Sequence, residues 1–76
     1  MTTRRGFSPL TEQARELLVY HQEREKLSNR ELAARSGISH TTVARIRSGD
    51  AVPAMDTFDH LMRSFGVQIV LEAVPI

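Results

Sequence analysis

The sequence contains no cysteine, and this absence excludes disulfide bonds and thiolate metal sites. A chain without disulfides suits a reducing cytoplasm, so we expect a cytoplasmic protein. Without disulfides or metals the fold depends on its apolar core, and 76 residues provide only a marginal one. We therefore expect one domain that associates with a partner chain.

Long apolar runs are also missing. The first 20 residues include Arg4 and Arg5, but Glu12, Arg15 and Glu16 then interrupt any apolar stretch. We therefore expect neither a secretory signal peptide nor a membrane span. Long polar tracts are equally absent, and a composition of 41% hydrophobic and 25% charged residues is typical of a globular domain.

Residue clusters that could support catalysis are lacking too. The three histidines, His21, His40 and His60, lie far apart on three expected helices, with no acid or thiol at a recognised ligand spacing. No glycine-rich phosphate loop, nucleophile elbow or carboxylate pair stands out. We therefore predict a protein that is not an enzyme, with no catalytic residue, metal site or cofactor.

The net charge is small, yet its distribution is uneven. The chain carries ten basic and nine acidic residues, a formal net charge of +1. Residues 24–47, called here the basic segment, hold six of the cations and two of the anions. Such a segment can attract nucleic acid, or it can be a solvated basic face without a partner.

Within this part of the chain, residues 27–49 (LSNRELAARSGISHTTVARIRSG) predict two short helices joined by a tight turn. Ser28 is a suitable N-cap, and Glu31 three residues later completes a capping box, so a helix should begin at Asn29. Gly37 can adopt the left-handed conformation that ends a helix. The first helix should therefore be about two turns long.

Ser39 is a second N-cap, and the helix after it should run from His40 to Ser48. Its inner side should be formed by Ile38 in the turn together with Val43 and Ile46. The outward side holds His40, Thr41, Ala44, Arg45, Arg47 and Ser48. This face has no large apolar member and two permanent cations, which suits the floor of a DNA groove.

Two helices joined by a short turn that contains Gly are typical of the helix-turn-helix, whose second helix lies in the major groove. From LSNRELAARSGIS through TTVARIRSG to P-x-x-x-TF-x-x-L, residues 27–67 resemble the Cro/cI-type (XRE) helix-turn-helix family without a gap. The resemblance covers 41 of 76 residues. It implies a mainly α, lambda-repressor-like domain of four to five helices and a role in sequence-specific DNA binding, usually as a repressor. It also implies a bacterial or phage origin.

A long helix should precede the motif. Ser8 followed by Pro9 predicts an N-cap and a helix that runs to about Glu25. Its apolar stripe consists of Leu10, Ala14, Leu17, Leu18 and His21. Because His21 takes a position that is apolar in the family, we expect a buried or half-buried structural histidine, with a ligand role as the alternative.

A fourth helix should follow the motif. Pro53 prevents the preceding helix from continuing, and the next should run over roughly residues 55–64. Its inner side should hold Phe58, Leu61, Met62 and Phe65, with His60 facing solvent. Ala54 stands where the family often has a Ser or Asp cap, so Asp56 could cap this helix instead.

The two ends of the chain lie outside the expected domain of residues 8–66. Residues 1–7 are polar and basic, which predicts a flexible arm whose Arg4 and Arg5 could reach phosphate or the minor groove. An arm without any role is equally open. Residues 67–76 alternate in polarity with many β-branched members, which predicts the one strand of the chain.

An isolated strand leaves backbone N–H and C=O groups unpaired, so this strand should pair with its copy in a homodimer, as an intersubunit two-stranded antiparallel ribbon. The dimerisation residues would be Val67, Ile69, Val70, Leu71 and Ala73. A strand that folds back on its own helices or frays is the alternative.

The fourth helix followed directly by a short apolar strand is similar to HipB-type antitoxins, a branch of the family. This similarity implies an alternative role, in which the protein binds its own operator and also neutralises a toxin protein. Tyr20, Val74, Ile76 and the outer face of the fourth helix are candidates for that contact. A third possibility is a protein-interaction adaptor that does not bind DNA.

The resemblance to lambdoid phage repressors also implies which residues contact DNA. Base-edge contacts fall on His40, Thr41, Ala44 and Arg45. Phosphate contacts are expected at Asn29, Ser39, Arg47 and Ser48. In the family an Arg of the first helix often pairs with a Glu of the third. Gln22 and Arg47 stand at those positions, so we expect no ion pair and a free Arg47. A homodimer would bind double-stranded DNA at a near-palindrome with half-sites about 10 base pairs apart.

Overall fold

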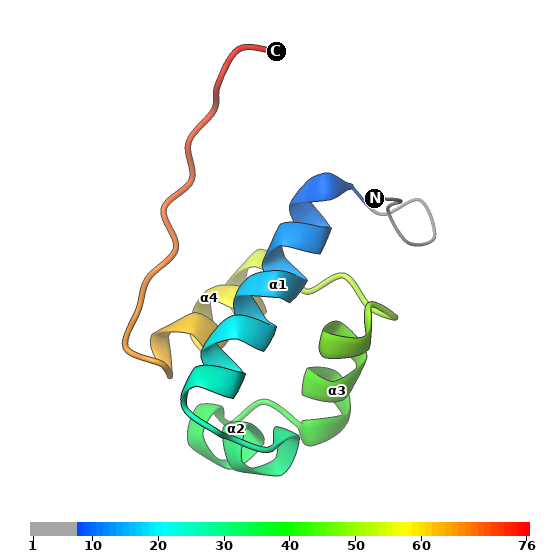
Figure 1. The fold of residues 1–76 in the computed structure, drawn as a ribbon, viewed down its shortest axis with the longest axis vertical. Coiled ribbons are helices and arrows are strands. Elements are labelled where there is room, and N and C mark those ends of the chain that lie inside the picture. Colours follow the sequence, from blue (N-terminus) through cyan, green and yellow to red (C-terminus); the bar gives the residue numbers. More distant parts are fainter. Residues whose placement is uncertain (1–7) are drawn as a thin grey trace.

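The computed structural model describes residues 8–76 as four α-helices followed by an extended C-terminal segment (Figure 1). The helices are α1 (Pro9–Arg24), α2 (Asn29–Ser36), α3 (His40–Ser48) and α4 (Met55–Arg63). The mainly α architecture is confirmed, and α1 and α4 end one residue before their predicted ends. None of these helices is long and apolar enough to cross a membrane. The predicted arm with Arg4 and Arg5 lies outside the described residues.

Helix caps explain why these boundaries could be predicted. The hydroxyl groups of Ser8, Ser28 and Ser39 accept backbone N–H groups at the starts of α1, α2 and α3. In α2 the capping box is complete, because the Glu31 carboxylate accepts the Ser28 backbone N–H at 2.7 Å. α4 begins after Ala54 without any side-chain cap, so the predicted capping by Asp56 is wrong.

Glycine ends both helices of the motif. Gly37 follows α2 with a φ of 78°, and Gly49 follows α3 with a φ of 86°. Both lie in the left-handed region, which glycine occupies without the steric cost that a Cβ brings. The short α2 and α3 are therefore limited at both ends by local sequence, and the turn between them is tight.

One apolar core joins the four helices. Its buried members are Leu18, Leu32, Val43, Ile46, Leu61, Met62 and Phe65. Burying each large side chain stabilises the fold by about 1.5–3 kcal/mol. The apolar stripe predicted on α1 is only partly buried in the core, because Leu10 and Leu17 remain 65% and 43% exposed. These two leucines line a groove between α1, the start of α4 and the C-terminal segment.

Residues 67–76 leave the helices as an extended segment, drawn orange to red in Figure 1. Val67 and Ile69 pack against the core, whereas Val70 and Leu71 are exposed. No strand occurs among residues 8–76. A ribbon between two subunits cannot appear in a single chain, so it stays a prediction.

Two histidines support the packing of α4. The ring of His21 is half-buried and stacks on Phe65 with centroids 5.5 Å apart, so the expected structural role is confirmed. The ring of Tyr20 meets it edge-on at 5.0 Å. His60 is exposed, but its Nε2 lies 2.6 Å from the Ser36 carbonyl oxygen. The expectation that His60 only faces solvent is therefore incomplete, because its ring meets the end of α2.

Candidate nucleic-acid interface

α3 presents the predicted base-contact residues to solvent. Its inner side is anchored in the core by Val43 and Ile46, both almost fully buried. The helical period then turns His40, Thr41 and Arg45 outward, and all three are exposed. Ala44 is partly buried at the edge of this face. Within residues 8–76, this face of α3 is therefore accessible to a ligand.

The two serines at the ends of α3 already have partners inside the protein. Ser39 Oγ accepts the Thr42 backbone N–H at 3.2 Å and donates to Thr42 Oγ1 at 3.0 Å. Ser48 Oγ lies 3.1 Å from the Arg45 carbonyl oxygen and 3.0 Å from the Asp50 carboxylate. A phosphate contact at either serine would have to share these hydroxyls with their present partners.

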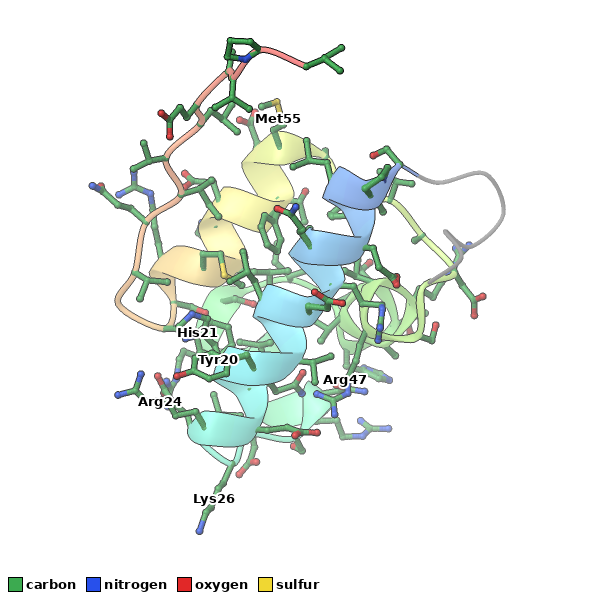
Figure 2. All side chains as sticks on the ribbon, turned by 45° about the horizontal axis from the view of Figure 1, so that its top comes forward. Tyr20, His21, Arg24, Lys26, Arg47 and Met55 are labelled. Atoms are coloured by element: carbon green, nitrogen blue, oxygen red, sulfur yellow. The ribbon has the colours of Figure 1, made fainter. Side chains whose placement is uncertain are left out.

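Arg47 is not free, so the sequence-based expectation is wrong. Its Nη1 donates to Gln22 Oε1 at 3.0 Å, and its Nη2 forms an ion pair with the Glu23 carboxylate at 2.8 Å. An ion pair between α1 and α3 is therefore present with its charges reversed relative to the usual pair of the family. The sequence comparison missed it because the acid stands one position further along α1. Figure 2 shows Arg47 at the side of α1.

Gln22 extends this contact to α2. The side chain of Gln22 is 2% exposed, and its Nε2 donates to Asn29 Oδ1 at 2.7 Å. Asn29 is the first residue of α2, where the helix has unsatisfied N–H groups and a partial positive charge. Sequence reasoning missed the role of Gln22. A signal existed, because it stands four residues after Leu18 on the buried side of α1.

The N-terminus of α2 also holds a fixed carboxylate. Hydrogen bonds lower the pKa of the Glu31 carboxyl below its ordinary value of 4.5. The Ser28 backbone N–H has the larger effect, and the Ser28 hydroxyl has the smaller one. Glu31 is therefore ionised at neutral pH and committed to capping. Glu31 is an acceptor and cannot bind an anion at this helix end, whereas Asn29, the first residue of α2, carries a side-chain donor there.

Most of the basic segment remains available to an anion. Arg35 pairs with Glu25 at 2.6 Å, and Arg47 pairs with Glu23. Within residues 8–76 no ion pair engages the other four cations, which are Arg24, Lys26, Arg30 and Arg45. All four are exposed, and Figure 2 shows Lys26 pointing away from the helices. Exposed cations of this kind bind the DNA backbone without regard to sequence.

Comparisons with known proteins support this geometry. A family model described as helix-turn-helix matches residues 21–71, which include all of α2, α3 and α4. Searches of curated proteins and of solved structures gave no match. Among the described residues no group of three or more potential metal ligands lies together. The matched residues include α2 and α3, so the surface formed by these two helices is the candidate functional site.

Proposed function

Because the chain belongs to the XRE-type helix-turn-helix family of DNA-binding transcription regulators, we propose that it is a repressor that binds a near-palindromic operator as a homodimer. The observation that carries the proposal is the outward exposure of His40, Thr41 and Arg45 on a helix whose other side is buried. In this motif the second helix enters the major groove with its N-terminal residues against base edges.

Base discrimination would depend most on Arg45. Its guanidinium can donate to O6 and N7 of one guanine at once, a pairing that other bases do not offer. His40 and Thr41 lie on the first turn of α3 and supply shorter polar groups. Ala44 could pack against a thymine methyl group. Together these four residues would give the helix a preference over a few adjacent base pairs.

Contacts to the DNA backbone would fix the orientation of the protein on DNA. Asn29 at the start of α2 lies where a phosphate is favoured by the helix dipole. Ser39 and Ser48 can contribute only by sharing hydroxyls that already have partners. Arg4 and Arg5, outside the described residues, remain part of the proposal as phosphate or minor-groove contacts.

A second copy of the chain would cover the exposed apolar residues on the side formed by α1, α4 and the C-terminal segment. The groove there has a volume of about 540 Å³. Its apolar lining includes Leu10, Leu17, Met55, Ile69, Val70 and Leu71. In a dimer the two segments of residues 67–76 would pair in antiparallel fashion, which would satisfy their backbone N–H and C=O groups.

Selection of bound sequences from random duplexes tests this function. A dimer should select a near-palindrome with half-sites about one helical turn apart, and its affinity should fall steeply with added salt. Selection of a single unpaired half-site would contradict the dimeric mode. Binding to no duplex at any salt concentration would contradict the whole proposal and favour an adaptor.

An antitoxin role is the second candidate, and exposed apolar side chains away from α3 favour it. Tyr20 is 57% exposed and Val74 is 70% exposed. Ile76 and the outer face of α4 are further candidates for the toxin contact. Co-purification of a stoichiometric partner protein would support this role, and its loss in a Tyr20→Ala or Val74→Asp variant would assign the surface.

A further inference from the structure

Three side chains from three helices form a continuous relay of hydrogen bonds. Arg47 of α3 donates to Gln22 of α1 at 3.0 Å, and Gln22 donates to Asn29 of α2 at 2.7 Å. Gln22 is buried between the other two. Among the described residues no buried side-chain nitrogen or oxygen lacks a hydrogen-bond partner. The relay therefore connects the end of α3 to the first residue of α2.

Arg47 determines the direction of this relay. A guanidinium only donates, so Gln22 must turn its oxygen toward Arg47 and its nitrogen toward Asn29. Asn29 must then offer its oxygen to Gln22. The ion pair with Glu23 at 2.8 Å holds the guanidinium in place from its other side. The side-chain nitrogen of Asn29 is consequently left on the side opposite Gln22.

This orientation matters because of where Asn29 lies. Among residues 8–76 its Oδ1 has Gln22 as a partner, while its Nδ2 has none. Nδ2 carries two N–H donors at a helix N-terminus, which suits an anionic oxygen. A reversed amide would present Oδ1 there and repel the same ligand.

We infer that Gln22 and Arg47 are positioning residues that hold the Asn29 amide with its donors toward a DNA phosphate. The inference rests on the proposed DNA-binding function and deepens it. Arg47 acts on the phosphate through Gln22 and Asn29. This indirect role replaces the direct contact between Arg47 and phosphate that was expected from the sequence. The polarity of a buried amide thereby becomes part of the DNA-binding site.

A Gln22→Glu substitution reverses the relay with little change of shape. The carboxylate still accepts from Arg47, but it cannot donate to Asn29. Asn29 should then rotate so that its nitrogen faces Glu and its oxygen faces the phosphate. We expect the selected operator duplex to bind roughly tenfold more weakly, the order of one lost hydrogen bond to a charged group. Thermal unfolding checks that the variant is folded.

The added negative charge could weaken binding by itself, and the Asn29→Ala background separates the two effects. If Gln22 acts through Asn29, the Gln22→Glu change should have almost no further effect once Asn29 is alanine. An equal loss of affinity in both backgrounds would overturn the positioning role. A weakening in the Asn29-containing protein alone supports it.

Amide exchange measured by NMR on the unaltered, DNA-free protein tests the relay itself. The Gln22 side-chain NH₂ should exchange slowly and the Asn29 NH₂ quickly. In Gln22→Glu the Asn29 NH₂ should instead exchange slowly, because it then donates to the carboxylate. A slowly exchanging Asn29 NH₂ in the unaltered chain would overturn the inference even if DNA binding is found. Failure of the proposed function is distinguishable, because it would appear as absence of duplex binding with the exchange pattern intact.

Discussion

The Nε2 atom of His60 lies 2.6 Å from the carbonyl oxygen of Ser36, which connects α4 to the C-terminal end of α2. A carbonyl only accepts, so Nε2 must carry the proton in this contact. The hydroxyl of Ser36, in a largely buried side chain, accepts the Ile38 backbone N–H at 3.1 Å. The turn of the motif is thus held from α4 as well as by its own glycine.

Replacing His60 with alanine should lower the free energy of unfolding by about 0.5–1.5 kcal/mol, the usual worth of one hydrogen bond. His40→Ala is the matched control, because His40 is exposed at the start of α3 and its loss should change stability by less than about 0.5 kcal/mol. Urea denaturation measures both. Equal losses in the two variants would show that the contact with Ser36 is not stabilising.

Local sequence determines the ends of α2 and α3, which is why they could be predicted. Ser28 with Glu31, and Gly37 after α2, act within a few residues of where they stand. The pairs Arg47–Glu23 and His60–Ser36 join segments 24 residues apart, so they depend on the packing of whole helices. The orientation of α3 and its outward face followed from the helical period, whereas the partners of its side chains did not.

The C-terminal segment shows a different limit of prediction from sequence. Alternating polarity in residues 67–76 predicts a strand, but a strand needs a neighbour for its hydrogen bonds, and within one chain the segment is merely extended. The exposed Leu10 and Leu17 of α1 show the same limit. Their helical spacing indicates that they are buried, but it does not identify the surface that covers them. In the dimer proposed above, a second chain would supply this partner.

Stability in acid should report the capping of α2 by Glu31. Its pKa is lowered in the folded state, mainly by the Ser28 backbone N–H, so its contribution is present above the unfolded pKa and is lost as the pH falls through the folded pKa. A Glu31→Gln variant keeps an acceptor for the Ser28 N–H but does not titrate. The stability difference between the two proteins should therefore shrink as the pH drops below 4.5.

Urea denaturation between about pH 3 and pH 7 measures this difference. Other carboxylates titrate in both proteins, so only the difference between the two curves is informative. Curves that stay parallel across the acid range would mean that the Glu31 carboxylate does not contribute to folding through its charge.

Dimerisation should be sensitive to charge on the apolar side of the C-terminal segment. Leu71→Asp places a carboxylate where two copies would meet, and we expect it to convert a dimer to a monomer in sedimentation equilibrium. Gln68→Asp is the control, since it adds the same charge to the same segment at an exposed polar position. If both variants, or neither, dissociate, residues 67–76 do not form the interface proposed here.

The most direct test of DNA recognition by α3 compares operator binding of Arg45→Ala and Arg63→Ala. Both changes remove one exposed arginine, but Arg63 lies on α4 and pairs with Asp59 at 2.9 Å. We predict that Arg45→Ala costs about 1–3 kcal/mol of operator affinity and relaxes the preference at one base pair in each half-site. Arg63→Ala should leave the selected sequence unchanged. Equal, sequence-independent losses in the two variants would contradict recognition of bases by this helix.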